Sequence, residues 1–150
     1  MRYGLSYMEQ SGCGIIAAYN ALILLDNPRS LQSLILWGDL NASIVFAQFG
    51  SNPWAIGSLF EGLGYYVYHV YNQAQYDAEI KNANLAIFTY WNNKGHVFDG
   101  AHTVCVQYAS GVINVYNEYN NVTTASKKNS IRKWISDNNL DPIDFCCIRK

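Results

Sequence analysis

The sequence predicts an α+β fold, with helices in the first part of the chain and a mostly antiparallel sheet after them. Three observations predict this class. A long apolar segment begins near residue 14, aromatic and β-branched segments follow from residue 65, and the turn-forming pair Ser110-Gly111 separates two strand-like segments. Helices followed by strands are typical of the α+β class rather than of alternating βα units.

Length and composition favour one domain. The chain has 150 residues, of which 50% are apolar and 14% are charged. A chain of this length buries a sizeable core without a disulfide or a metal to hold it together. No internal repeat, linker or low-complexity segment divides it, so we expect residues 1–150 to form one domain.

The charge pattern argues against two classes of partner. The formal net charge is −1, so the chain lacks the basic excess that nucleic-acid binding requires. Its basic cluster, Lys127-Lys128 and Arg132-Lys133, is expected on a solvated helix face. No segment reaches the roughly 20 apolar residues that span a bilayer, and the first residues lack the apolar segment of a secretory signal. We expect a cytoplasmic protein that binds neither nucleic acid nor membrane; its oligomeric state is not indicated.

The helices are predicted from apolar patterns and capping residues. Gly14 to Leu25 is apolar almost all round, which predicts a buried central helix that ends at Asp26-Asn27-Pro28. Ser30 is a suitable N-cap for a second helix over Leu31 to Trp37. We also expect Asn41 to Gly50 to be helical.

The middle of the chain contains a third helix and two strands. Asn52-Pro53 combines a capping residue with a proline at the first helical position, and Gly62 to Gly64 ends that helix. After it we expect a strand over Tyr65 to Tyr71, a short helix over Tyr76 to Asn82, a strand over Leu85 to Trp91 and a loop over Asn92 to Gly95.

A hairpin is the best-defined element of the second half. His102 to Ala109 and Val112 to Asn117 are its strands, joined by the two-residue turn Ser110-Gly111. This turn places Ala109 opposite Val112 and Val104 opposite Asn117. The chain then ends with a helix over Ser130 to Asn138 and a strand over Ile143 to Ile148.

Cys13 is the candidate nucleophile. It lies in Glu9-Gln10-Ser11-Gly12-Cys13-Gly14, directly before the first apolar helix. The positive end of a helix favours the thiolate, which is the reactive form of cysteine. The alternative is a packed thiol, since cysteines beside apolar helices are commonly buried. We expect the other cysteines, Cys105, Cys146 and Cys147, to be structural; no C-x-x-C spacing suggests a metal site.

A nucleophilic cysteine needs a base, and the chain offers three histidines. His69 lies inside an aromatic strand and is expected to be a partly buried structural residue. His96 lies in a loop and is expected to be solvated. His102 opens a strand, where its side chain can emerge at the end of the sheet, so we select it as the base.

Asn117 is the expected orienting residue for His102. The predicted register makes the two residues diagonal neighbours on one face of the hairpin, roughly 7–8 Å apart at the backbone. The side-chain oxygen of Asn117 could then accept a hydrogen bond from one imidazole nitrogen. A register slip of one residue would favour Asn114 or Glu118 instead, and Asp99 is a further candidate.

Three segments together carry a family resemblance. They are Gln10-Ser11-Gly12-Cys13-Gly14-Ile15-Ile16-Ala17-Ala18-Tyr19-Asn20-Ala21-Leu22, Ala101-His102-Thr103-Val104-Cys105-Val106 and Val115-Tyr116-Asn117. The chain resembles the papain-like cysteine peptidases, in particular the small bacterial group that processes bacteriocin leader peptides after a double glycine, and its stand-alone relatives. The resemblance implies a papain-like fold with N-terminal helices packed on the sheet. It also implies Cys13, His102 and Asn117 as a catalytic triad.

The sequence departs from the family at the oxyanion hole. The family usually has a glutamine six residues before the cysteine, where this chain has Tyr7; Gln10 is three residues before. We expect Gln10 and the backbone N–H of Cys13 to form the hole. If Gln10 does not reach, Cys13 would need another donor, and a lost donor costs about 10²–10³ in rate.

The resemblance implies a thiol hydrolase that cleaves a peptide or isopeptide bond through an acyl-enzyme, with no metal or organic cofactor. Two alternatives remain open. The same triad serves an acyltransferase or amidase that acts on a small metabolite or a carrier-bound acyl group. A catalytically inactive relative could instead bind a peptide along the aromatic strand Tyr65 to Tyr71. The expected partner is therefore a peptide or acyl-amide substrate.

Overall fold

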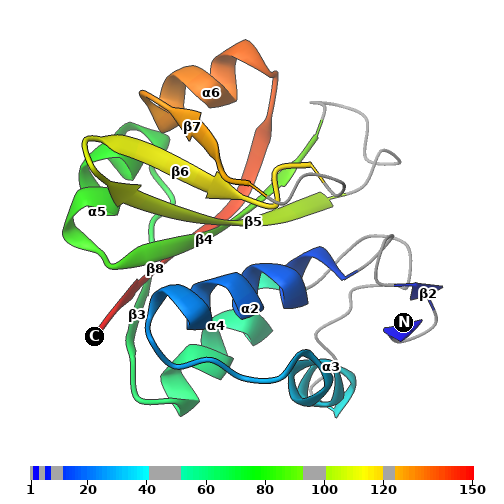
Figure 1. The fold of residues 1–150 in the computed structure, drawn as a ribbon. Helices are drawn as coiled ribbons and strands as arrows, with labels where there is room; N and C mark the ends of the chain where they lie inside the picture. Colours follow the sequence, from blue (N-terminus) through cyan, green and yellow to red (C-terminus); the bar gives the residue numbers. More distant parts are fainter. Residues whose placement is uncertain (1, 4–5, 8–11, 41–51, 93–100, 120–123) are drawn as a thin grey trace.

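The structure is a computed structural model, and it describes residues 2–3, 6–7, 12–40, 52–92, 101–119 and 124–150. Three helices lie on one face of a central sheet, below it in Figure 1: α2 (Cys13–Leu24), α3 (Leu31–Leu40) and α4 (Pro53–Gly62). Two shorter helices, α5 (Tyr76–Asn82) and α6 (Ile131–Asp137), pack on the opposite face. This arrangement confirms the α+β class.

Six strands form the sheet, in the order β3-β8-β4-β5-β6-β7, and each strand is antiparallel to its neighbours. Their bounds are β3 (Tyr66–His69), β4 (Leu85–Trp91), β5 (Ala101–Ala109), β6 (Val112–Tyr116), β7 (Ser126–Lys128) and β8 (Asp141–Arg149). A short 3-10 helix, η1 (Gln73–Gln75), precedes α5, and β1 (Arg2–Tyr3) pairs with β2 (Ser6–Tyr7) as a separate two-stranded sheet. The predicted mostly antiparallel sheet is confirmed.

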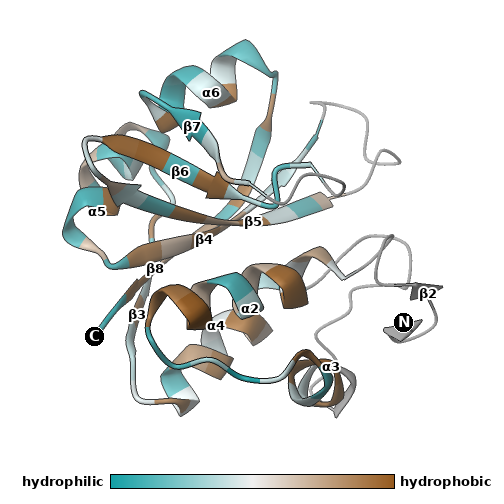
Figure 2. Ribbon diagram, in the orientation of Figure 1, coloured by the Kyte–Doolittle hydropathy of each residue, from teal (hydrophilic) through white to brown (hydrophobic). Residues whose placement is uncertain are grey.

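The sheet separates two hydrophobic cores because successive strand residues point to opposite faces. On β5, Cys105 packs under α2, whereas Val104 and Val106 pack toward α5 and α6. Figure 2 shows hydrophobic residues along α2 and along the central strands that carry these cores. Because α2 is apolar all round and largely buried, the prediction of a central helix is confirmed.

The predicted capping residues begin their helices. The Asn52 side chain accepts a hydrogen bond from the Trp54 N–H at 3.0 Å, at the start of α4. Ser30 accepts from the Ser33 N–H at 3.1 Å before α3. Local sequence therefore fixed both starts, because each side chain satisfies an N–H that has no partner within the helix.

The hairpin has the predicted turn and register. Ser110 and Gly111 both have positive φ, 53° and 78°, as a tight turn between twisted strands requires. Ala109 pairs with Val112, and the register continues to Cys105 and Tyr116. The next residue, Asn117, lies just beyond the end of β6.

Several expectations differ from the structure. The strands β1, β2 and β7 were not predicted, and α3 continues to Leu40 rather than ending at Trp37. The expectation that Lys127 and Lys128 lie on a helix face is wrong, because both are in β7, which pairs with β6. Strand propensity is low for lysine, so pairing with β6 overrides it here. The helix predicted over Asn41 to Gly50 lies outside the described residues.

Within the described ranges, no helix combines the length and apolarity needed to cross a bilayer.

Candidate active site

Cys13 is the first residue of α2, which begins one residue before the predicted start at Gly14. Its neighbour Gly12 occupies the capping position and offers no side chain to bond the first turn. The N–H groups of a first turn have no partner within the helix and carry its positive end. Cys13 therefore sits where backbone donors and the helix dipole both favour negative charge.

His102 lies near the start of β5, and its Nε2 forms a 2.7 Å hydrogen bond with the backbone carbonyl oxygen of Asn117. Asn117 is the predicted partner of His102, but the atom that accepts the bond differs from the predicted one. We expected the Asn117 side-chain oxygen to accept this bond. Instead the carbonyl accepts it, and the side-chain Nδ2 is buried without a hydrogen-bond partner. With Nε2 engaged, the remaining ring nitrogen, Nδ1, is left for Cys13.

The backbone conformation of Asn117 explains this substitution of atoms. Asn117 has φ 66°, in the left-handed region, which asparagine tolerates better than most residues. The chain turns there and ends β6, and the turn directs the Asn117 carbonyl toward His102. Because β5 and β6 pair from Cys105 onward, the first residues of β5 have no β6 partner.

Cys13 contacts the end of β5 that pairs with β4 but extends beyond its pairing with β6. It forms hydrogen bonds with the His102 side chain and with both the backbone and the hydroxyl of Thr103. Thr103 is buried, and its Oγ1 lies 3.1 Å from Oγ1 of Thr89 on β4. Because β6 does not pair with Thr103, the backbone of Thr103 on that side can bond the sulfur. The Thr89–Thr103 bond holds that hydroxyl in place.

Opposite pKa shifts in Cys13 and His102 follow from these contacts. Burial by itself raises the pKa of the Cys13 thiol, but the hydrogen bond and charge of His102, with the bonds from Thr103, together lower it. Burial lowers the pKa of His102, but the bond and charge of Cys13 and the backbone bonds with Asn117 and Glu118 raise it overall. Each group therefore shifts the pKa of the other toward its charged form.

The other three cysteines differ from Cys13. Burial raises the pKa of Cys105, raises that of Cys146, and raises that of Cys147 to about 12. Their exposed fractions are 1% or less, whereas Cys13 keeps 8%. The prediction of three structural thiols agrees with this burial. Cys13 is also buried, but among the four it alone has a lowered pKa.

Aromatic side chains enclose His102 on the α6 side of the sheet. The Tyr90 ring meets the His102 ring edge to face at 5.8 Å, and Trp134 packs on Tyr90 at 5.5 Å. A hollow of about 190 Å³ lies next to these rings. It is lined by Tyr90, Asn92, Glu118, Tyr119, Trp134, Asn138 and Leu140. Neither Cys13 nor His102 lines this hollow.

The side chains of Asn114 and Glu118, two of the three alternative orienting residues, have other neighbours than His102. The register leaves Asn114 opposite Gln107, in the middle of β6. The Glu118 carboxylate accepts from Lys128 at 3.0 Å and from the Trp134 indole at 3.1 Å. Gln10, His96 and Asp99 lie outside the described residues, so the predicted role of Gln10 in the oxyanion hole stays a prediction.

Sequence reasoning missed Thr89 and Thr103. A signal was present, since both are polar at positions that alternate with apolar residues in buried strands. A polar side chain on the core-facing side of such a strand must find a partner. A polar residue within a buried apolar strand is therefore the signal that identifies both threonines.

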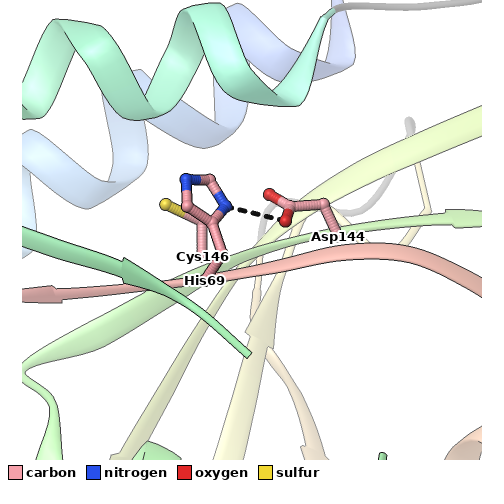
Figure 3. Close-up of side chains that lie close together, drawn as sticks. All are labelled: His69, Asp144 and Cys146. Carbon is pink, nitrogen blue, oxygen red and sulfur yellow. Dashed lines mark hydrogen bonds and ion pairs between the residues drawn. The ribbon is translucent and has the colours of Figure 1, made fainter. Parts of the chain in front are cut away.

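A second group of reactive side chains lies elsewhere on the sheet (Figure 3). His69, Asp144 and Cys146 bring their ligand atoms within 4.8 Å of one another. His69 is partly buried, as predicted, and its Nδ1 lies 2.7 Å from Asp144 Oδ1. Among the described residues, this is where the side chains could hold a metal ion. Sequence reasoning did not find this cluster, because the three residues come from two strands and lack metal-ligand spacing.

No protein-family model matches the sequence, and no curated protein matches it either. The geometry of the residues described above is therefore the basis for a functional assignment.

Proposed function

We propose that this protein is a thiol hydrolase of the papain-like type, which cleaves a peptide or isopeptide bond with Cys13 as nucleophile and His102 as acid and base. Cys13 at the first position of a helix and His102 at the start of a strand support this assignment. So does the order of the candidate residues along the chain, with the cysteine first and His102 and Asn117 later on the sheet.

The observation that carries the proposal is the Cys13–His102 pair. Each residue shifts the pKa of the other toward its charged form, although burial opposes both charges. Such pairing is characteristic of nucleophile sites, because a thiolate is reactive at a pH where an ordinary thiol is not. A packed structural cysteine would show the effect of burial alone, as Cys105 does.

The proposed reaction is acyl transfer in two steps. The Cys13 thiolate attacks the substrate carbonyl carbon, and the carbonyl electron pair moves onto oxygen. When that oxyanion collapses, the C–N bond breaks, and His102 gives its proton to the departing amine. Water then attacks the thioester, His102 takes one proton from this water, and the C–S bond breaks. The acid product leaves, and the thiolate–imidazolium pair is restored.

The first turn of α2 supplies part of the oxyanion hole in this proposal. The backbone N–H of Cys13 has no partner within the helix, because it is in the first turn. It lies on the same residue as the attacking sulfur, so it is close to any carbonyl that the sulfur attacks. Gln10 is the second donor that the resemblance implies, and its variant Gln10→Ala would lose about 10²–10³ in rate if it fills that role.

Asn117 acts on His102 through its main chain. The 2.7 Å bond from His102 Nε2 to the Asn117 carbonyl fixes the ring and its tautomer, so that Nδ1 points to Cys13. The carbonyl also stabilises the imidazolium, since it accepts from a charged donor. Orientation by a backbone atom does not require a particular side chain at this position.

Alkylation and acyl trapping test the proposal. At pH 6, iodoacetamide should modify Cys13 far faster than the other three cysteines, as read by peptide mass spectrometry. Incubation with a peptide library should leave an acyl adduct on Cys13. Adding an amine that competes with water as the acceptor separates a hydrolase from an acyltransferase. Alkylation of Cys13 at the rate of Cys105 would overturn the proposal and favour a binding module.

A further inference from the structure

The His69–Asp144–Cys146 cluster follows from the strand register. His69 at the end of β3 pairs directly with Cys146 on β8, so the two side chains are cross-strand neighbours. Asp144 precedes Cys146 by two residues and therefore points to the same face of the sheet. Figure 3 shows the imidazole between the thiol and the carboxylate, with the three side chains rising from adjacent strands.

One oxygen of Asp144 lacks a partner. The Asp144 side chain is fully buried, and its Oδ1 accepts the hydrogen bond from His69. Its Oδ2 is also buried, but no hydrogen bond reaches it. Burying an unpaired carboxylate oxygen is costly, because it loses its hydration without compensation. The cluster therefore contains an acceptor that a ligand could satisfy, in addition to the imidazole and the thiol.

We propose that His69, Asp144 and Cys146 bind a zinc ion. Their donors are one nitrogen, one oxygen and one sulfur, and zinc binds all three types. The Asp144 carboxylate and a Cys146 thiolate carry two negative charges, so a divalent ion makes the buried group electrically neutral. A thiolate ligand selects zinc over magnesium and calcium, which prefer oxygen ligands.

Binding needs a modest rearrangement. Zinc bonds of about 2.0–2.3 Å place ligand atoms roughly 3.2–3.7 Å apart, so the widest separation of up to 4.8 Å must close by about 1 Å. Rotation of the His69 and Asp144 side chains provides this movement. The ion replaces the hydrogen bond between them. Cys146 releases its thiol proton to solvent, and His69 stays neutral, with its proton on the ring nitrogen that does not bind zinc.

The surroundings suit an ion with limited access to solvent, which would take water as its fourth ligand. His69 is 22% exposed and gives a route to solvent. On the other side, α4 covers the cluster at Gly57, where an added Cβ would lie 3.5 Å from His69 Nε2 and Cys146 Sγ. The ion would join the edge strand β3 to β8 beneath α4. We therefore expect it to stabilise the fold rather than to take part in chemistry at Cys13.

Cobalt is the probe for the test, because a cobalt–thiolate bond gives a near-ultraviolet absorption band. The titration uses the full chain carrying Cys13→Ala, so that the reactive thiol cannot contribute. We expect the band to grow to one cobalt per chain and to disappear when zinc is added. Zinc at a hundredfold excess over its Kd should raise Tm by roughly 5–10 °C relative to the chelator-treated protein.

Variants assign the ligands. Cys146→Ala should abolish the cobalt band, whereas the matched control Cys147→Ala, which removes the neighbouring thiol on the opposite face, should keep it. Asp144→Asn should weaken zinc binding at least tenfold, because it removes a charge and leaves the shape unchanged. This variant also tests the ligand assignment if Cys146→Ala does not fold. Absence of the band in the parent protein, or its persistence in Cys146→Ala, would overturn the proposal and leave the assignment of Cys13 unaffected.

Discussion

Two regions of this protein bring a cysteine and a histidine together, and they have opposite properties. At the start of α2, the contacts between Cys13 and His102 lower the pKa of the thiol and raise that of the imidazole. Beneath α4, Cys146 lies beside His69, yet the pKa of its thiol is raised, first by burial and then by negative neighbours that include Asp144. The same two residue types therefore accompany a lowered thiol pKa in one place and a raised one in the other.

The difference lies in what the histidine bonds. His102 gives Nε2 to a neutral backbone carbonyl, so its other nitrogen and any positive charge are available to Cys13. His69 bonds the Asp144 carboxylate at 2.7 Å, and that carboxylate, not the thiol, becomes its charge partner. The donors differ too, because Thr103 donates to Cys13. The comparison teaches that a nearby histidine does not by itself lower the pKa of a cysteine; the other groups that contact the thiol and the imidazole decide the direction of the shift.

A row of polar side chains connects the two regions across the sheet. Thr89 pairs with Thr103 on one side and with Asp144 on the other. All three are buried at 1% exposure. Only the Thr89–Thr103 half of the row is closed by a hydrogen bond, since Asp144 Oδ2 has no partner. The two regions therefore share a face of the sheet and are separate in their hydrogen bonding.

Removal of the nucleophile should have the largest effect. Cys13→Ala should reduce turnover of any substrate by roughly 10⁶-fold, because no other group can form the acyl-enzyme. Cys147→Ala is the matched control and should retain turnover, since that thiol is buried in the other core. Steady-state kinetics measure both. Substantial turnover in Cys13→Ala would show that Cys13 is not the nucleophile.

His102→Ala should come next, with a loss of at least about 10⁴-fold in turnover. It should also move the acid limb of the alkylation rate of Cys13 to higher pH, because the imidazolium no longer favours the thiolate. The sign follows from the lowered pKa of Cys13, which makes the thiolate available well below the ordinary range of a thiol. Stopped-flow alkylation from pH 4 to 10 measures the limb, and Gln107→Ala on the same strand is the control. An unmoved limb would contradict the pairing.

Thr103→Val should have an intermediate effect. It keeps the shape of the side chain but removes the hydroxyl that bonds the sulfur and Thr89. A hydrogen bond to a charged group contributes about 1.5–3 kcal/mol, so alkylation near pH 6 should slow by roughly tenfold or more. Thr103→Ser retains the hydroxyl and should recover most of the rate. Equal rates for the Val and Ser variants would rule out a role for that hydroxyl.

Asn117→Gly should have a smaller effect, with turnover reduced less than about tenfold. The carbonyl that bonds His102 remains, and glycine adopts the φ of 66° without strain. Asn117→Ala should cost about 1 kcal/mol more in stability, because a Cβ disfavours the left-handed conformation. Urea denaturation and kinetics separate the two effects. A loss in Asn117→Gly as large as in His102→Ala would mean that the side chain, rather than the backbone, orients the base.

The smallest change is expected at the second cluster. Asp144→Asn removes a charge that raises the pKa of Cys146, but burial is the largest cause of that shift. Cys146 should therefore stay unreactive to iodoacetamide at pH 8 in the metal-free variant, by peptide mass spectrometry. Rapid labelling of Cys146 would show that the carboxylate, and not burial, separates the two thiols.

Local patterns predicted much of the fold. The caps at Ser30 and Asn52, the central helix and the Ser110-Gly111 hairpin depend on near neighbours in sequence, and each agrees with the structure. The strand β7 could not be predicted in this way, because its lysines have low strand propensity and pair only through the presence of β6. Position along the chain sufficed to select Cys13 and His102, since each lies at an element boundary.

By itself, the sequence determined that a cysteine begins a buried helix, that a histidine begins a strand, and that a tight turn sets the register between His102 and Asn117. Those are local properties of caps, periodicity and turns. Only the tertiary structure decided which atoms meet: the Asn117 carbonyl instead of its side chain, Thr103 at the sulfur, and Asp144 beside His69. The physical reason is that electrostatic partners are chosen by distances between elements far apart in the chain, which no local pattern encodes.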